Sequence, residues 1–305
     1  MTIALENAGA IADPAVLASS VRGRRARRLR WWKEAGAIGI AVLVLIWTLV
    51  PVYNIFMVSL ESKGDVFTET IFPARPSLDS FWIVITQGYW YLEEFWHQFA
   101  NSVYIGVGTV AITLAIGSLA SFAIGRMRIR YGWMLSNAAL LTYVIPASFL
   151  AIPFYRIMQI YGLTNNLWSV IAAEVTFATP YAIFIFHQYG TSIPIELDEA
   201  ARIDGASPFQ VYWKIYLPLM APALVAVGTY ALLLAWNEYL YQFLLLTSKH
   251  SMSVPVALAQ FLNSDEAPWN YMMATAIVYA ILPIVIYYMV RGRMTAGLTV
   301  GGVKG

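Results

Sequence analysis

Six long apolar stretches constrain this 305-residue chain more than any other feature of its sequence. A helix needs about 20 predominantly apolar residues to cross a membrane, because it rises about 1.5 Å per residue through about 30 Å of hydrocarbon. The stretches long enough are residues 36–60, 99–125, 131–155, 167–189, 219–247 and 269–290. Backbone polar groups in lipid must be bonded within their own segment, so each stretch is expected to be helical. We therefore predict an all-α integral membrane protein with six transmembrane helices.

The composition excludes a water-soluble enzyme. Hydrophobic residues make up 59% of the chain and charged residues 12%, whereas soluble domains are about half apolar and about a quarter charged. The apolar residues lie in unbroken blocks, which disfavours the alternating pattern of a transmembrane β-barrel. With no cysteine and three scattered histidines, the sequence predicts neither a catalytic residue nor a metal site.

The distribution of positive charge predicts the orientation in the membrane. With the N-terminus inside, most of the 19 Lys and Arg residues fall in cytoplasmic segments, as the positive-inside rule requires. The basic run 22–30 precedes an apolar stretch too long for a signal peptide, so we expect this segment to be retained. The prediction is a flexible basic cytoplasmic tail over 1–34, a transmembrane domain over 35–290 and a cytoplasmic tail over 291–305.

The longest outer segment, residues 61–98, is unusually rich in aromatic residues. They are Trp82, Tyr89, Trp90, Tyr91, Phe95 and Trp96. One interpretation is an aromatic belt on an amphipathic helix at the lipid headgroups. The other is a docking surface for an external partner, and the two are compatible.

The cytoplasmic segment 190–218 carries ordered helix signals. Ser192 can cap a helix that has Pro194 near its first turn and acidic residues beside the positive end of its dipole. Gly205 can end that helix in a left-handed conformation. Ser207 and Pro208 repeat the start signal, and Pro218 limits the second helix. The sequence therefore predicts a short helix, a tight turn and another short helix.

The spacing within this segment resembles the EAA loop of ABC importer permeases, EAA-x3-G-x9-I-x-LP. All its fixed positions are filled, by Glu199, Ala200, Ala201, Gly205, Ile215, Leu217 and Pro218. Residues 294–305, the run Trp236-Asn237-Glu238-Tyr239 and the pair Asn101-Ser102 are similar to the second, maltose-type permease subunit of binding-protein-dependent carbohydrate importers. The resemblance covers about residues 36–305 and leaves out the basic tail.

The resemblance implies a fold, a location and partners. The fold is the type I ABC importer permease architecture, with both termini cytoplasmic, in a bacterial inner membrane. The expected partners are a homologous permease in a heterodimer, two copies of a cytoplasmic ATPase and an external solute-binding protein, with membrane lipid around them and no nucleic acid. The motif residues and Asp204 would couple the chain to the ATPase, and the cargo would be a sugar or a sugar derivative.

The chain itself contains no G-x-x-x-x-G-K-[ST] phosphate loop, so we expect no ATP site of that kind on it. ATP and magnesium would be bound by the partner ATPase. The chain is accordingly predicted to be a transport subunit and not an enzyme.

Two acidic residues lie inside the predicted spans, Glu174 and Glu238. Such residues are costly in a membrane and call for a reason. They can pair within the permease dimer, line a watery pathway or couple transport to protons. Asn237 favours the pathway, since an amide and a carboxylate suit sugar hydroxyls. Candidate pathway residues are Glu174, Trp236, Asn237, Glu238 and Tyr239.

Two other functions stay open on the residues alone. The chain could be an ABC importer permease for a non-carbohydrate solute. It could also be an ion-coupled transporter or a membrane enzyme that uses Glu174 and Glu238, although the sequence of the loop is less consistent with these functions.

Overall fold

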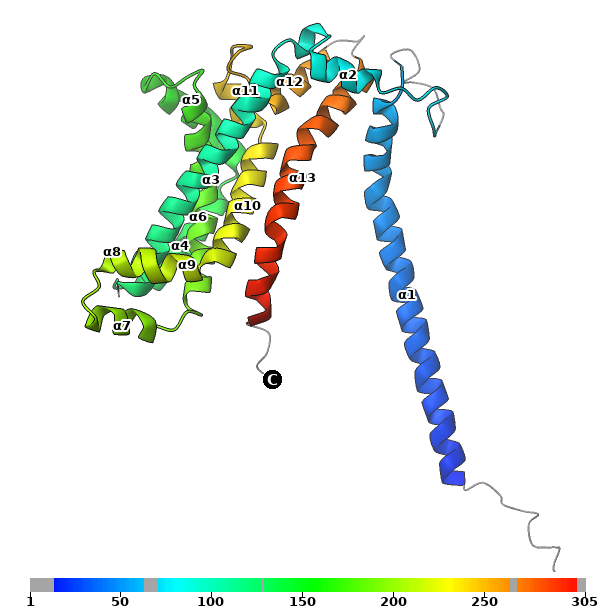
Figure 1. The fold of residues 1–305 in the computed structure, drawn as a ribbon, viewed down its shortest axis with the longest axis vertical. Helices are drawn as coiled ribbons and strands as arrows, with labels where there is room; N and C mark the ends of the chain where they lie inside the picture. Colours follow the sequence, from blue (N-terminus) through cyan, green and yellow to red (C-terminus); the bar gives the residue numbers. More distant parts are fainter. Residues whose placement is uncertain (1–13, 63–70, 128, 264–267, 301–305) are drawn as a thin grey trace, which may run out of the picture. The chain divides into compact units, whose positions relative to one another are not determined.

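The computed structural model describes residues 14–62, 71–127, 129–263 and 268–300 (Figure 1). These residues form helices, turns and loops, and no strand occurs among them. The chain divides into two units, Met1–Met57 and Val58–Gly305. Each unit is described by itself.

The first unit consists of most of α1, a helix of 46 residues from Pro14 to Ser59. Its part Trp31–Ser59 is long and apolar enough to cross a membrane. The expectation of a flexible tail over 1–34 is wrong for residues 14–34, which are helical; residues 1–13 lie outside the described residues. Helix-favouring Ala, Arg and Leu carry the helix back to Pro14, and proline is well tolerated at a helix start because its missing N–H has no partner there.

The core of the second unit is formed by four long helices. Helix α3 packs along α6 and α10, and α13 packs against α10 (Figure 1). Their bounds are Phe95–Arg126, Leu167–Gly190, Ala221–Asn237 and Trp269–Val300. The α3–α6 contact is close because its residues are small: a Cβ atom added to Gly117 would lie 2.8 Å from the Cβ of Ala182. Small residues at such contacts let membrane helices approach.

One predicted span is broken. Residues 131–155 form α4, η2 and α5, and the pair of segments is bent by 94°. Their bounds are Gly132–Leu141, Thr142–Val144 and Ala147–Ile160. The break falls at Pro146, which lacks an N–H and disfavours helical geometry in the residue before it. Ile145 is accordingly extended, with φ −88° and ψ 115°.

The fifth span is also discontinuous. It enters through α8, the π-helical segment η3 and α9, then bends by 77° into α10, and it continues after Glu238 as α11. The bounds of these shorter elements are Pro208–Val211, Tyr212–Tyr216, Leu217–Leu219 and Leu240–Leu245. The described residues hold four continuous helices long enough to span a membrane, and six spans if each bent pair counts as one. The six predicted spans agree with that count.

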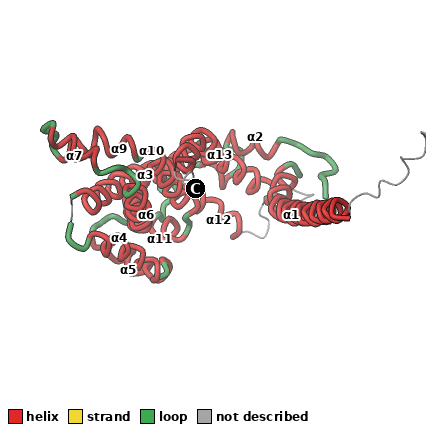
Figure 2. Tube along the Cα trace, turned by 90° about the horizontal axis from the view of Figure 1, so that it is seen from below, coloured by secondary structure: helices red, strands yellow, loops and turns green. Residues whose placement is uncertain are grey.

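Helix α7, Glu196–Ile203, lies with α8 at one end of the second unit (Figures 1 and 2). The opposite end carries α2, η1, α11, α12 and η4. The bounds not yet given are Asp79–Thr86, Trp90–Leu92, Val254–Gln260 and Phe261–Asn263.

The aromatic residues of the outer segment have mixed surroundings. Tyr89 packs against Phe261 and Tyr271, with ring centroids 6.1 and 5.3 Å away. These rings fill the space between η1, η4 and α13. Trp82 and Trp90 are exposed, as both an aromatic belt and a docking surface require. Residues 63–70 of this segment lie outside the described residues.

Candidate functional site

Helix α7 has two different faces. Glu196, Glu199, Ala200 and Ile203 follow the three- and four-residue spacing of one helix face and are exposed. Ile203 has 87% of its surface exposed. On the other face, Asp198 is buried, and Ala201 packs against a buried cluster that includes Val211 and Tyr212. The first two residues of the Glu-Ala-Ala run thus face outward and the third faces the protein.

The turn after α7 has the predicted geometry. Gly205 adopts φ +83°, and its N–H donates to the carbonyl of Arg202 at 3.1 Å. The N–H of Ala206 donates to the carbonyl of Ala201 at 2.9 Å. These are the two hydrogen bonds of a Schellman motif, which requires a left-handed residue. Asp204 is exposed immediately before the glycine.

The second start signal is confirmed and the first is wrong. The Ser207 hydroxyl accepts from the N–H of Gln210, and the Gln210 side chain accepts from the N–H of Ser207, which is a complete capping box. Ser192 instead donates to the carbonyl of Tyr189, because the chain turns once more before α7 begins at Glu196. Ile215 lies in η3 and is half-buried, while Leu217 and Pro218 open α9.

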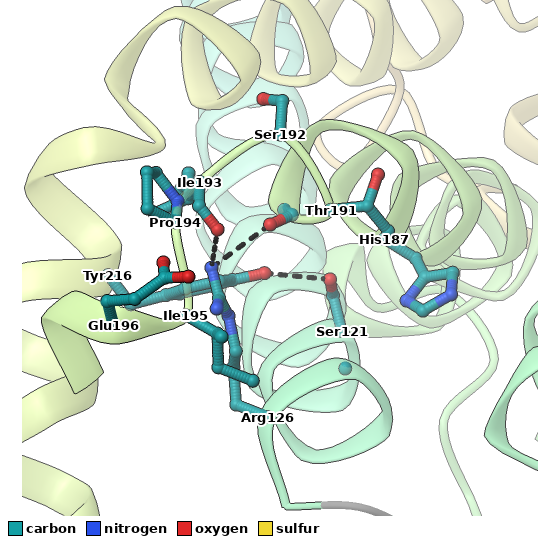
Figure 3. Close-up of a pocket in the computed structure, with 12 residues that line it drawn as sticks. Ser121, Arg126, His187, Thr191, Ser192, Ile193, Pro194, Ile195, Glu196 and Tyr216 are labelled. Carbon is teal, nitrogen blue, oxygen red and sulfur yellow. Dashed lines mark hydrogen bonds between the residues drawn. The ribbon is translucent and has the colours of Figure 1, made fainter. Parts of the chain in front are cut away.

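Arg126, the last residue of α3, lies at the centre of this region (Figure 3). Its Nη2 donates to the carbonyls of Gly190 and Ile193 at 3.1 and 2.8 Å. Its Nε lies 3.5 Å from Oδ2 of Asp198, and both side chains are about 95% buried. The guanidinium also lies over the ring of Tyr216, 5.6 Å from its centroid. A cavity of about 340 Å³ adjoins these groups and is lined in addition by Ser121, His187 and the loop from Thr191 to Glu196.

Two tyrosines fix η3 to α3. The hydroxyls of Tyr212 and Ser118 are hydrogen-bonded at 2.8 Å, and those of Tyr216 and Ser121 at 3.0 Å. Both tyrosine side chains are buried. The loop is therefore held against α3 by hydroxyl pairs as well as by Arg126.

Glu238 caps a helix at the break in the fifth span. Its backbone is extended, with φ −70° and ψ 132°, between α10 and α11. Its carboxylate accepts from the N–H of Tyr241 at 2.9 and 3.0 Å and from that of Gln242 at 3.1 Å. These are free donors at the start of α11, where the helix dipole also favours a negative charge.

The other pathway candidates lie in different surroundings. Glu174 is fully buried, and among the described residues its carboxylate has no hydrogen bond. Trp236 is 3% exposed and stacks on Tyr279 with ring centroids 4.4 Å apart. Asn237 and Tyr239 are exposed. Of the five, only Asn237, Glu238 and Tyr239 therefore reach the surface of the chain.

The two helix breaks lie beside each other. The hydroxyl of Tyr241, just after the second break, donates to the carbonyl of Ala147, just after the first, at 2.7 Å. Tyr143, just before the first break, donates to the carbonyl of Phe177 in α6 at 2.6 Å. Gln242 donates to the carbonyl of Ala235 at 2.9 Å, which lies in the last turn of α10. The Gln242 side chain thus satisfies a carbonyl where α10 stops, and Tyr241 connects the two breaks.

Comparison with known proteins identifies the family of the chain. Residues 113–296 match the family model described as the binding-protein-dependent transport system inner membrane component. The chain belongs to this family. It is 33% identical over 283 residues to the trehalose transport system permease protein SugB of Mycobacterium tuberculosis, covering 92% of this chain and 99% of the relative. It is 31% identical to the arabinooligosaccharides transport system permease protein AraQ of Halalkalibacterium halodurans, covering 88% and 95%.

A solved structure shows the same fold. It is the crystal structure of a bacterial ABC transporter involved in the import of the acidic polysaccharide alginate, with a TM-score of 0.72 and 24% identity. The match covers 88% of this permease and 97% of that chain. The permease is thus a multi-pass inner membrane component of a binding-protein-dependent transport system and not an enzyme, and the two relatives are named as sugar permeases.

The sequence analysis did not identify Arg126, Asp198, Tyr212 or Tyr216 as site residues of this permease. One signal was present for Asp198, which shares a helix face with Ala201 and is therefore a charge on the inward side of α7. Within the described residues, no group of three or more His, Cys, Asp or Glu side chains could hold a metal ion.

Proposed function

We propose that this permease moves a sugar or a sugar derivative into the cytoplasm, driven by ATP hydrolysis on separate subunits. The loop 190–218 would receive the motion of a cytoplasmic ATPase. The proposed complex contains this chain, a homologous permease, two copies of the ATPase, which bind ATP and magnesium, and an external solute-binding protein.

The observation that carries the proposal is the shape of α7. Its outward face presents Glu199, the small Ala200 and a largely exposed Ile203. The helix is ended by a Schellman turn, and its inward face is held by buried contacts. A rigid helix with one exposed, shallow face is suited to fit a cleft on another protein and to move with it.

Two observations support a carbohydrate cargo. The relatives are named for trehalose and arabino-oligosaccharides, and Asn237 and Glu238 give the break in the fifth span a donor and acceptors for hydroxyl groups. Discontinuous spans are where many transporters bind their cargo. A structural neighbour, described as an alginate transporter in complex with a periplasmic protein, supports the external binding protein.

The test is purification followed by transport. We expect the tagged chain to co-purify with an ATPase, and vesicles containing the complex to take up labelled trehalose or arabino-oligosaccharides only with ATP and the binding protein. Ala200→Trp should abolish co-purification and uptake, because the large ring blocks the shallow face of α7. Ala100→Trp, at an exposed alanine of the opposite end of α3, is the matched control.

The outcomes separate the alternatives. Co-purification without uptake of any saccharide would favour a non-carbohydrate cargo. A pure chain without an ATPase, or uptake driven by an ion gradient, would overturn the proposal.

A further inference from the structure

Arg126 connects elements that are far apart in the sequence. Its guanidinium contacts the loop after α6 at Ile193 and η3 at Tyr216 (Figure 3). It also contacts the end of α6 at Gly190 and α7 at Asp198. A second contact runs the other way, since Nη2 of Arg202 in α7 donates to the main-chain carbonyl of Arg126 at 3.3 Å. One residue at the end of α3 therefore contacts α6, the loop before α7, α7 itself and η3.

The covalent chain gives α7 no comparable connection to α3. The loop joins α6 to α10, so a movement of α7 can act on those two helices through the backbone. Helix α3 ends at Arg126, 64 residues before the nearest of its loop partners along the chain. The contacts between α7 and α3 are therefore made by side chains, among which Arg126 and Asp198 form a buried charged pair.

The chemistry of this contact favours a rigid joint over a source of stability. A guanidinium is planar, presents its donors in a fixed fork and stays charged, so it fixes the angle between the groups it binds. A buried ion pair adds little net stability but is costly to break, because the remaining charge is left without a partner. The Tyr212–Ser118 and Tyr216–Ser121 pairs extend the joint along two turns of α3.

We propose that Arg126 is a positioning residue that transmits the displacement of α7 to α3, with Asp198 as its partner on α7. The inference rests on the proposed function, since α7 is the part that the ATPase would move. It identifies how the motion enters the helix bundle. Helix α3 moves with the loop, and its close packing against α6 and α10 carries the motion to those helices.

The decisive readout is the amount of sugar taken up per ATP hydrolysed by the complete complex in vesicles. In Arg126→Gln and Asp198→Asn, we expect ATP hydrolysis to stay within about twofold of the unmodified complex while uptake per ATP falls about tenfold. Arg126→Lys keeps the positive charge but loses the planar arrangement of donors. Its uptake per ATP should lie between those of Arg126→Gln and the unmodified complex. Arg130→Gln is the matched control, because it removes an exposed arginine four residues further along and should leave the ratio unchanged.

A second measurement does not depend on transport. Hydrogen exchange of amides 196–206 should speed up about tenfold in Arg126→Gln and not in Arg130→Gln. If Arg126→Gln does not accumulate in the membrane, Tyr216→Phe replaces it as the test variant. It keeps the ring, removes only the hydrogen bond to Ser121 and should lower the uptake per ATP two- to threefold. Unchanged uptake per ATP in active complexes, or unchanged hydrogen exchange, would contradict the role given to Arg126 and leave the proposed function intact. An unmodified complex that shows no ATP-dependent uptake would overturn the proposed function and this inference with it.

Discussion

Glu238 illustrates how a carboxylate within a membrane span can be stabilised without a cation. Its two oxygens accept from the backbone of Tyr241 and Gln242 at the start of α11. Hydrogen bonds from N–H groups that the helix itself leaves free supply what a salt bridge would otherwise have to provide. Glu238 therefore caps the helix that follows the break, a role that the sequence analysis did not consider beside pairing and the pathway.

Substitution of Glu238 separates capping from pathway chemistry. Glu238→Ala removes all acceptors and should cost about 0.5–2 kcal/mol of stability, as the loss of a helix cap does. Glu238→Gln retains one acceptor oxygen and should cost less. The measurement is thermal unfolding of the purified complex beside sugar uptake, with Asn237→Ala as the control for stability alone, because that side chain bonds Leu233 in α10 and not α11. Full stability in Glu238→Ala with reduced uptake would show that the side chain acts on the cargo and not on α11.

Gly205 offers a test of the turn after α7. No atom lies within 4 Å of the position of an added Cβ, so the only cost of a side chain is its φ of +83°. Gly205→Val should therefore abolish uptake while insertion into the membrane and sugar binding by the external protein persist. Gly205→Asn should retain most uptake, since asparagine tolerates left-handed geometry. Equal uptake in the two variants would contradict a role for this geometry.

At the scale of elements, the sequence predicted a turn and a helix start that neighbouring residues determine. It did not predict contacts between residues distant in the chain. The Gly205 turn and the helix start at Ser207 follow from residues within four positions of each other, and both were predicted, whereas the start predicted at Ser192 is not formed. The first break falls at Pro146, which is a local signal, whereas the side chains of Tyr241 and Gln242 reach acceptors 94 and seven positions away. Composition and spacing did not reveal these partners.

Tyr241 joins the two breaks, which makes it the element-scale test. Tyr241→Phe removes the hydroxyl bonded to Ala147 and keeps the ring against Phe154 and Phe177. We expect a loss of about 0.5–1.5 kcal/mol, the usual contribution of one hydrogen bond, and slower uptake because the breaks no longer move together. Thermal unfolding and initial uptake rates measure these effects. Tyr287→Phe, at an exposed tyrosine of α13, should change neither; the same small effect in both variants would argue against a coupling of the breaks.

At the scale of the whole molecule, the surface around the first break is unsuited to contact with lipid. Every residue from 141 to 149 is exposed, and Ile145 and Pro146 have extended backbones. Non-helical backbone at membrane depth is tolerated where it is covered by protein or lines a water-filled cavity, and not where it faces lipid. We therefore expect this face to be covered by protein or to line a water-filled cavity, and either agrees with the proposed pair of permeases.

The cysteine-free sequence allows this to be tested with single cysteines. Val144 is 76% exposed beside the break, and Trp47 is 81% exposed on the continuous helix α1. We expect Val144→Cys to react with a membrane-impermeant maleimide about tenfold faster than Trp47→Cys in membranes that contain the complete complex. The reason is that a water-filled pathway brings hydrated reagent to the break, whereas lipid excludes it from a continuous apolar helix. Addition of cargo-loaded binding protein should change the rate at position 144 alone, because only that position follows the opening of the pathway. Equal, slow labelling at both positions would contradict a water-lined break and leave coverage by the second permease as the explanation of its exposed backbone.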